Sequence, residues 1–574
     1  MKEGDILLIF KNEQLLDNEI KKLTKLTKYI SIVRLVIAIF LLVFAVSLIS
    51  LGDYALYGSL SAIFLILLIS FILLTNRFYD SLELKKRKKH VYMLHEKRRN
   101  KEYSQFLDTG NDFIDSNDYK QLDLDIFGNN SLYQYLSICK TKKGRELLAK
   151  KLTNPEVEDN GYTKAIYEMA NCEDMLDVEA SLYNFQTKAK SVDYEEFNSI
   201  GSKINIKFID FIPLLSFVFL IIYLVLIFTN GFNPIGIVIL LILNVLLSRI
   251  NSRHNVMKLN ATLYYNLCDS YINTIKVINT VSLNNECFNK IKTNINNELI
   301  NLKKLRGAYS LLSSRGNIIF SLILNSALIF DLWLLLLLRV RCKNLSKINV
   351  IFDEVARLEA MMSLANVGMD CLVYCIPNTR KHIIAKGIYH PLVKDCVLND
   401  IEIDQGIILT GSNMSGKTTF MRTIGINQVL FNAGSIVCAE SYYSYYFEVI
   451  TSLRANDMLS EGISTFYAEI LRMKAINKGI NEQKCLILID EIFKGTNAFE
   501  RISASIKIIE RLNSSKSLFI ISTHDFELCD CEGIINYHFN EEYDDNKISF
   551  DYKIKEGKCE SKNALYLLKM ADII

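Results

Sequence analysis

The sequence predicts a multi-domain protein in which a helical amino-terminal part, containing transmembrane hairpins, precedes an α/β carboxy-terminal domain. Three observations lead to this fold class. Four long apolar runs lie within the first 250 residues, a glycine-rich loop stands between a strand-like and a helix-like segment at 407–430, and two later apolar runs end in polar residues. At 574 residues, the chain is long enough for several domains.

The four apolar runs have the length of membrane-spanning helices. The first contains a single charged residue, Arg34, and the second contains none. A membrane helix needs about 20 apolar residues, and buried helices of soluble proteins usually keep a polar face. The sequence therefore predicts two transmembrane hairpins, with membrane lipid as a partner, built from the runs 30–51, 55–75, 211–229 and 232–248.

The charges around these runs predict their orientation. Residues 85–101 contain nine lysines and arginines against one acid, Glu96, whereas the loop inside the first hairpin offers only Asp53. Because positive charge marks the cytoplasmic side, we expect a multi-pass protein of the cell membrane with its carboxy-terminal domain in the cytoplasm. The same basic segment could instead contact the phosphates of a nucleic acid.

A fifth apolar run, Ile318 to Leu338, contains Asn325 and Asp331. An Asp near the middle of a membrane span is costly, and one extra span would place the carboxy-terminal domain outside the cell. We therefore expect a buried helix here, with a membrane span as the alternative.

The glycine-rich loop matches the phosphate-binding pattern G-x-x-x-x-G-K-[ST] at every fixed position. Its glycines let backbone N–H groups close around phosphate oxygens, and the following helix adds a favourable dipole. Lys417 is expected to reach the β- and γ-phosphates, and the Thr418 hydroxyl to bind Mg²⁺. ATP and Mg²⁺ are thus the predicted cofactors, and the ATP-binding residues of this segment are Gly411, Ser412, Asn413, Met414, Ser415, Gly416, Lys417, Thr418 and Thr419.

Two later runs complete the predicted site. Residues 485–489 are continuously apolar, as expected of a central parallel strand, and are followed by Asp490 and Glu491. Asp490 can hold the Mg²⁺ and Glu491 can polarise an attacking water. The run 518–522 leads to His524, which is either a γ-phosphate sensor or an ordinary structural histidine. The predicted catalytic residues are therefore Glu491, His524 and Lys417.

Four segments of this region carry a family resemblance. They read TGSNMSGKTTFMR at 410–422, STFYAE at 464–469, DEIFKGT at 490–496 and STH at 522–524. Together they strongly resemble the ATPase domain of the MutS family of DNA mismatch repair proteins. The resemblance is dense over 380–570, where it includes His390-Pro391 and Lys555-Glu556-Gly557. It is thin upstream, where 122–155 looks like the start of the MutS core domain and 358–366 like the end of its lever helices.

The resemblance implies at least a dimer, with ATP bound between two subunits. Ser464 and Thr465 of one subunit would approach the γ-phosphate held by the partner, although the same residues also suit an ordinary helix N-cap. Asn413 would contact phosphate, and residues 495–496 would cross the interface. Tyr552, five residues before the last glycine of the chain, would stack on adenine, with an ordinary strand tyrosine as the alternative.

The sequence also departs from the family pattern. Ser412 and Cys438 stand where the family usually has proline, and neither change removes a ligand. The chain ends at Ile574, where the family commonly continues into a helical dimerisation tail, which shortens the expected dimer contact. The apolar runs occupy the place of the mismatch-reading and connector domains, so we expect any DNA binding to be independent of mismatches.

These features give five expected segments. They are an amino-terminal helix with the first hairpin at 1–80, a basic helical segment with the start of the core at 81–205, the second hairpin at 206–250, a helical core and lever at 251–379, and the ATPase domain at 380–574.

The leading functional hypothesis is a membrane-anchored, MutS-like ATPase whose nucleotide state switches a homodimeric clamp on branched or non-specific duplex DNA. The net charge of +3 gives no sign of nucleic-acid binding by itself, and the 13 cysteines lack the paired spacing of a structural zinc site. One alternative is a regulatory or mechanical membrane ATPase with no DNA ligand. An ATP-driven transporter is a third possibility, disfavoured by the scarcity of polar residues in the apolar runs.

Overall fold

The computed structural model describes most of the chain and divides into two compact units. The described residues are 3–49, 54–188, 197, 208–230, 233, 235–251, 261–314, 324, 330–343, 345–412, 414–454, 465–482, 484–493, 497–515, 517–544 and 547–559. The first unit comprises Met1–Met93, Glu173–Ser282 and Lys290–Val355, and the second comprises Leu94–Cys172, Leu283–Asn289 and Ala356–Ile574.

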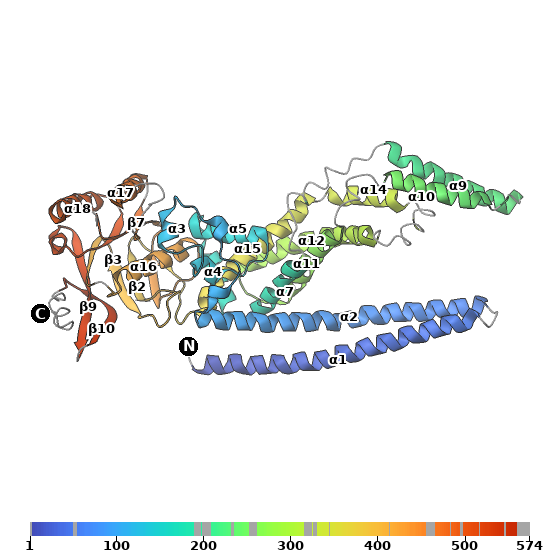
Figure 1. Ribbon diagram of the computed structural model, residues 1–574, viewed down its shortest axis with the longest axis horizontal. Helices are drawn as coiled ribbons and strands as arrows, with labels where there is room; N and C mark the ends of the chain where they lie inside the picture. Colours follow the sequence, from blue (N-terminus) through green and yellow to red (C-terminus); the bar gives the residue numbers. More distant parts are fainter. Residues whose placement is uncertain are drawn as a thin grey trace. The chain divides into compact units, whose positions relative to one another are not determined.

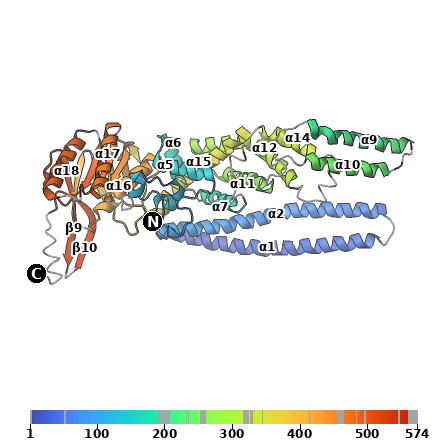
Figure 2. The same cartoon turned by 45° about the horizontal axis from the view of Figure 1, so that its top comes forward.

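The first unit is built from helices in its described part. Figures 1 and 2 both show α1 and α2 side by side as a long antiparallel pair, and α9 and α10 as a shorter one. The helices that contribute to this unit are α1 (Glu3–Ile49), α2 (Tyr54–Arg99), α7 (Met175–Lys188), η3 (Phe208–Phe211), α9 (Ile212–Asn230), α10 (Ile235–Asn251), α11 (Ala261–Thr280), α12 (Glu286–Ser314), α14 (Phe330–Cys342) and α15 (Leu345–Asp370).

Polar contacts join α1 to α2 inside the region that was expected to be transmembrane. Arg34 on α1 donates from Nε to the Thr75 hydroxyl at 3.1 Å and from Nη2 to the side-chain amide oxygen of Asn76 at 3.1 Å. Its guanidinium also lies over the Tyr79 ring, 5.0 Å from the ring centre. The one charge of the first apolar run is therefore satisfied by the partner helix.

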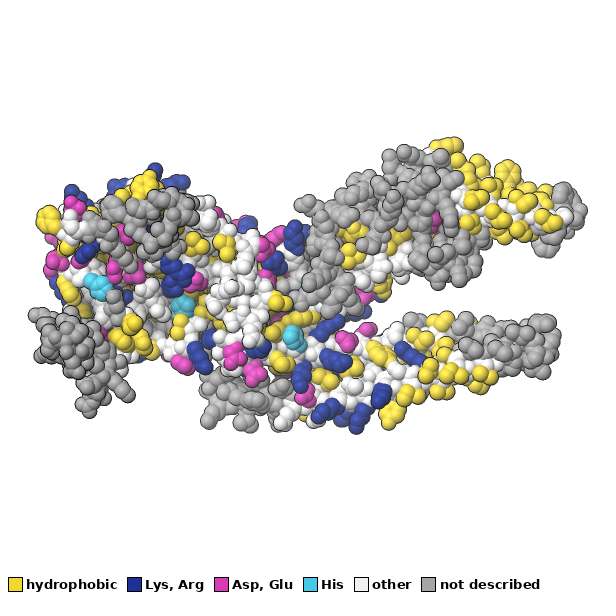
Figure 3. Space-filling model, viewed as in Figure 1, with side chains coloured by type: hydrophobic (Ala, Val, Ile, Leu, Met, Phe, Trp, Pro, Cys, Tyr) yellow, Lys and Arg dark blue, Asp and Glu magenta, His cyan; other side chains and the backbone are white. Residues whose placement is uncertain are grey.

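Within the described residues, no helix combines the length and the apolar character that a bilayer crossing requires. The prediction of transmembrane hairpins at 30–51, 55–75, 211–229 and 232–248, and with it the multi-pass membrane location, is therefore wrong. In the second hairpin, the apolar run of the sequence is longer than the helix that it forms, because α10 begins only at Ile235 and has 17 residues. Membrane lipid as a partner has no remaining support, although Figure 3 shows apolar side chains gathered over α9 and α10.

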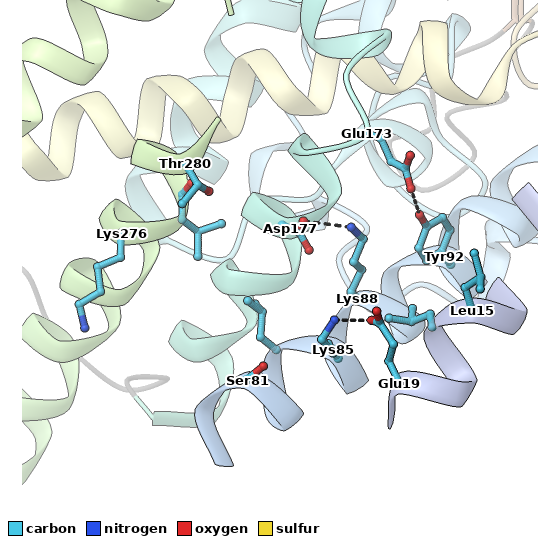
Figure 4. Close-up of a pocket in the computed structure, with 13 residues that line it drawn as sticks. Leu15, Glu19, Ser81, Lys85, Lys88, Tyr92, Glu173, Asp177, Lys276 and Thr280 are labelled. Atoms are coloured by element: carbon cyan, nitrogen blue, oxygen red, sulfur yellow. Dashed lines mark hydrogen bonds and ion pairs between the residues drawn. The ribbon is translucent and has the colours of Figure 1, made fainter. Parts of the chain in front are cut away.

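The basic residues of α2 form ion pairs within the first unit. Lys85 pairs with Glu19, Lys88 lies 3.0 Å from the Asp177 carboxylate, and Lys89 lies 2.6 Å from that of Asp17. Figure 4 shows the first two pairs in a cavity of about 490 Å³ lined by α1, α2, α7 and α11. Much of the positive charge read as an orientation signal thus holds this helix against acidic neighbours.

The fifth apolar run is only partly described. Its second half forms the start of α14, in which Asp331 is 2% exposed and Leu334 is fully buried. The described half therefore agrees with a buried helix, while 318–323 and 325–329 lie outside the described residues.

The second unit contains two sheets and their covering helices. Its remaining helices are η1 (Tyr103–Gln105), η2 (Asn111–Phe113), α3 (Tyr119–Asp123), α4 (Leu132–Leu136), α5 (Lys142–Thr153), α6 (Asn160–Ala170), α16 (Lys417–Asn432), α17 (Thr465–Glu482), α18 (Ala498–Asn513) and η6 (Phe526–Asp530). Its strands are β1 (Asn378–Thr379), β2 (Ile383–Ile388), β3 (Asn399–Ile403), β4 (Gly406–Thr410), β5 (Ser441–Ser444), β6 (Glu448–Ser452), β7 (Cys485–Asp490), β8 (Leu518–Ser522), β9 (Ile534–Asp544) and β10 (Lys547–Glu556).

The larger sheet has the strand order β10-β9-β4-β8-β7-β6 and is parallel except for its β10 edge. Residues 485–489 of β7 are fully buried, as expected of a strand covered on both faces. The helices α17 and α18 contribute Ile476, Ile509 and Leu512 to the same core. The expected α/β architecture of the carboxy-terminal part is confirmed. The smaller sheet, in the order β1-β5-β2-β3, is mixed.

One buried carboxyl stands out in the packing of the second unit. Glu359 on α15 is fully buried and accepts the backbone N–H groups of Lys140 and Thr141 at 2.9 and 3.2 Å. The Thr141 hydroxyl donates to the other carboxyl oxygen. Burial raises the pKa of Glu359 to about 7 in spite of these bonds.

Candidate functional site

The phosphate-binding loop leads from β4 directly into α16. Its two fixed glycines adopt left-handed conformations, with φ of 140° at Gly411 and 105° at Gly416. A Cβ on Gly411 would lie 2.9 Å from the Ser415 hydroxyl oxygen and 3.0 Å from the Phe539 carbonyl oxygen. Glycine is therefore required there both by the backbone and by the space. The strand, loop and helix order expected from the motif is present.

Lys417 is the first residue of α16 and is 5% exposed. Its Nζ donates to the carbonyl oxygens of Gly411 and Ser412, both at 2.7 Å. Burial lowers the pKa of Lys417, while Asp490 and Glu491 act in the opposite direction. The ammonium group thus lies inside the loop, where phosphate oxygens would provide stronger acceptors than neutral carbonyls.

Asp490 ends β7 and joins three elements. One carboxylate oxygen accepts the Thr418 hydroxyl at 2.8 Å, and the other accepts the Ser522 hydroxyl from the end of β8. Hydroxyl and carboxylate oxygens are the hard ligands that Mg²⁺ prefers. No group of three or more His, Cys, Asp or Glu residues in the described chain is arranged to hold a metal. A magnesium ion at Thr418 and Asp490 would therefore need phosphate and water oxygens to complete its shell.

Glu491 and His524 lie together at the same edge of the sheet. The His524 Nε2 is 3.2 Å from a carboxylate oxygen of Glu491. The Glu491 N–H donates to the Ser522 carbonyl at 3.1 Å, and its φ of 60° turns the backbone out of the strand. A left-handed conformation in a non-glycine residue costs energy and is found mostly at functional sites. Two of the three residues predicted to be catalytic, Glu491 and His524, are therefore neighbours.

These residues border a cavity of about 620 Å³. Lys417, Thr418, Asp490 and Glu491 line one part of it, and Tyr552 lines another. Tyr552 is 46% exposed, and its Cδ1 would lie 3.2 Å from a Cβ placed on Gly416. The tyrosine ring thus stands beside the phosphate-binding loop, in the region where a nucleotide base would be expected.

The sequence reading missed one wall of the cavity. Residues 393–397 and Asn399 line it together with His390, between the His-Pro element and the loop. His390 is 8% exposed, and its burial, with Arg422 and Lys101 nearby, lowers its pKa to about 3, so the ring is neutral. Residues 393–397 match no binding motif. Their position just after His390-Pro391 is the one feature of the sequence that points to a place at the site.

Several predicted site residues are not fully placed. Asn413, Ser464 and residues 495–496 lie outside the described residues. The helix α17 begins at Thr465, where the N-cap interpretation expected a helix start, but the Thr465 side chain is not described. The described contacts therefore leave the proposed approach of Ser464 and Thr465 to a partner's phosphate as a prediction.

A second polar cluster forms around Asp123 and Asp125, at and just after the end of α3. Asp123 accepts the Leu453 N–H at 2.9 Å and lies 3.2 Å from the Arg472 guanidinium of α17. Asp125 pairs with Arg422 of α16 at 3.2 Å and with Arg454 after β6 at 2.5 Å. The segment that resembles the start of the MutS core thus touches the ATPase region through two carboxylates.

Comparison with known proteins agrees with this geometry. Residues 407–573 match the family model described as MutS domain V. The chain is 32% identical over 260 residues to MutS protein homolog 4 of Mus musculus, a match that covers 40% of this chain and 26% of the relative. It is 31% identical over 251 residues to DNA mismatch repair protein MutS of Clostridium tetani, covering 40% of this chain and 28% of the relative.

The similarity therefore spans little more than a quarter of the length of these relatives. The residues matched by the family model include the phosphate-binding loop, β7 and β8. The carboxy-terminal part of this chain, residues 407–573, is thus similar to MutS domain V.

Proposed function

We propose that this protein binds ATP with Mg²⁺ and hydrolyses it to ADP and phosphate. The contact from the Thr418 hydroxyl to the Asp490 carboxylate carries the proposal, because it brings the end of the phosphate-binding loop to the end of β7. The buried Lys417 ammonium beside that pair supplies a positive charge for the β- and γ-phosphates. These groups come from segments more than 70 residues apart in the chain, so their meeting does not follow from one local motif.

The chemistry proposed for the chain's own residues is positioning and proton acceptance. Lys417 and the loop N–H groups orient the triphosphate, and Thr418 and Asp490 hold the metal. The metal, when bound, neutralises charge that develops on the phosphate oxygens. Glu491 orients a water and accepts its proton as the oxygen–phosphorus bond forms and the bond to the β-phosphate breaks. His524, at 3.2 Å from Glu491, orients that carboxylate.

The proposed assembly is a homodimer with ATP at the subunit interface. The relatives named as MutS proteins support a role on DNA, as do the segments that resemble the MutS core and lever. We propose that nucleotide state switches a dimeric clamp that holds branched or non-specific duplex DNA. Contacts to phosphates alone give affinity with little sequence information, and their strength falls steeply with salt.

A specific observation favours a second candidate, a regulatory or mechanical ATPase without a DNA ligand. In the basic segment of α2, Lys85, Lys88 and Lys89 are paired with acidic residues of the first unit. Arg98 is buried and donates to the backbone carbonyls of Tyr135 and Ser137 at 2.9 and 3.2 Å. These cations are engaged within the protein and are not arranged as an open phosphate-binding surface.

Binding to perfect, mismatched and branched duplexes across a salt series separates the two candidates. The full-length protein is expected to bind duplex DNA at low salt, with less than a tenfold preference for a mismatch, about 1.4 kcal/mol. A larger mismatch preference would reveal a reading element that the proposal lacks. No binding to any duplex, together with intact ATP hydrolysis, would favour the ATPase without a DNA ligand.

A further inference from the structure

The backbone at Tyr552 is held in an unusual conformation. Tyr552 has φ of 52°, inside β10 rather than in a turn. The register between β10 and β9 shifts between Phe550 and Ile554, so the strand is bulged at this residue. A left-handed conformation is uncommon for a bulky residue and persists only where surrounding contacts hold it. The ring that faces the phosphate-binding loop therefore depends on a local support.

That support is the side chain of Asn399. Its Nδ2 donates to the Tyr552 carbonyl at 3.0 Å, and its Oδ1 accepts the Ile554 N–H at 2.9 Å. The amide thus satisfies both backbone groups on either side of the bulge, in place of a neighbouring strand. Asn399 is 7% exposed, so its two bonds are protected from competition with water.

Asn399 also connects the two sheets. It is the first residue of β3, at the edge of the smaller sheet, whereas Tyr552 belongs to β10, at the edge of the larger one. Lys553 adds a contact in the same place, because its Nζ lies 2.5 Å from the Leu398 carbonyl oxygen. Both Asn399 and Tyr552 line the cavity of the phosphate-binding loop.

We propose that Asn399 is a positioning residue for nucleotide recognition, which fixes the Tyr552 ring where the base of ATP binds. The inference rests on the proposed ATP-binding function and adds to it a residue that sets the affinity for the base. The role requires an amide, since one atom must donate to the Tyr552 carbonyl while the other accepts from the Ile554 N–H. An Asp retains the acceptor and loses the donor.

The test compares ATP with inorganic tripolyphosphate, which has no base. Binding of each is measured by calorimetry, with Mg²⁺, for the full-length protein and for Asn399→Ala, Asn399→Asp, Tyr552→Ala and the double variant Asn399→Ala/Tyr552→Ala. We expect Asn399→Ala and Tyr552→Ala each to weaken ATP binding about tenfold, in the range of one base stacked on an aromatic ring. Tripolyphosphate binding should change less than twofold, and the double variant should be no weaker than either single variant.

A matched control is Asn513→Ala, because the Asn513 side chain also bridges two segments, donating to the Glu532 carbonyl at 2.8 Å away from the cavity. This control should bind ATP normally. Asn399→Asp should lose part of the ATP affinity that Asn399→Ala loses. It also allows the role of Asn399 to be tested if the alanine variant does not fold.

Three results would overturn the inference. Equal losses for ATP and tripolyphosphate would show that Asn399 only maintains the fold. Additive losses in the double variant would show that Asn399 acts independently of Tyr552. Normal ATP binding by both Asn399 variants, with a loss in Tyr552→Ala, would show that the ring needs no such support. Failure of the unmodified protein to bind ATP would instead refute the proposed function itself.

Discussion

Two polar clusters that both involve α16 use similar residues in opposite ways. At the loop end, Lys417, Thr418 and Asp490 border a cavity of about 620 Å³. In the other cluster, Asp123 and Asp125 are paired with three arginines that come from α16, α17 and the segment after β6. The first cluster directs its polar groups toward a space that a ligand can fill, whereas the second pairs its carboxylates with its own arginines. The comparison teaches that convergence on a cavity, rather than the presence of charge, distinguishes a binding site from a structural network.

The largest expected effect is on the cavity side. Lys417→Ala should abolish ATP binding, with a loss of at least about a hundredfold, because no other described cation lies within the loop. Calorimetry with ATP and Mg²⁺ measures it, and Lys507→Ala, an exposed lysine on α18, serves as the control. Near-normal ATP binding by Lys417→Ala would show that the cluster beside the cavity is not a nucleotide-binding site.

Glu491→Ala should separate binding from hydrolysis. We expect ATP affinity within a few-fold of the unmodified protein and a fall in kcat of about a hundredfold or more, because the residue acts on the water rather than on the phosphates. Steady-state phosphate release gives kcat, and Glu510→Ala on α18 is the control. Hydrolysis at the normal rate in Glu491→Ala would exclude this residue as the base.

Substitutions in the cluster of Asp123 and Asp125 should change the stability of the fold rather than ATP binding. Asp123→Ala leaves the Arg472 guanidinium, 6% exposed, without its buried carboxylate, and should lower the free energy of unfolding by about 3–5 kcal/mol. Urea denaturation measures this change. Asp530→Ala, which removes an exposed partner of Lys558, should have little effect. A small effect of Asp123→Ala would show that its charges contribute no more than a surface pair.

Glu359 offers the smallest and most pH-specific test. Its pKa of about 7 lies above the value of 4.5 for an unperturbed Glu, so the folded state binds the proton more tightly than the unfolded state. Its contribution to stability is fully present below pH 4.5 and is lost as the pH rises to about 7, with a total change of about 3 kcal/mol.

Glu359→Gln keeps the acceptor for the Lys140 and Thr141 N–H groups and cannot ionise. It should therefore flatten the dependence of unfolding free energy on pH between 4.5 and 7. An unchanged pH profile in the variant would assign that dependence to other groups.

The site could be predicted from the sequence where residues with recognisable chemistry directly follow the strands of the parallel sheet. The loop, Asp490, Glu491 and His524 each follow an apolar run, and the carboxyl ends of parallel strands meet at one edge of a sheet, so these residues had to lie close together. Asn399 could not be identified in this way. Its role depends on side-chain contacts between β3 and β10, edge strands of different sheets, which no local sequence pattern records.

The helical region shows the opposite outcome. Hydropathy counts apolar residues but does not report where a helix begins or which side chains pair across helices. The Arg34 contacts with Thr75 and Asn76, and the late start of α10 at Ile235, are tertiary facts of this kind. The basic residues of 85–101 likewise suggest contact with a membrane surface or a nucleic acid. In the structure, several of them instead pair with acidic residues distant in the sequence.

Asp125 makes α16 and the end of β6 mechanically dependent on one another. Arg422 is five residues after Lys417 on the same helix, and Arg454 directly precedes the segment that leads to α17. Because one carboxylate holds both guanidinium groups, a tilt of α16 must either lengthen the 3.2 Å pair with Arg422 or carry Asp125, and with it Arg454, along. Asp125 thus gives the helix that follows the phosphate-binding loop a direct polar connection to the chain after β6.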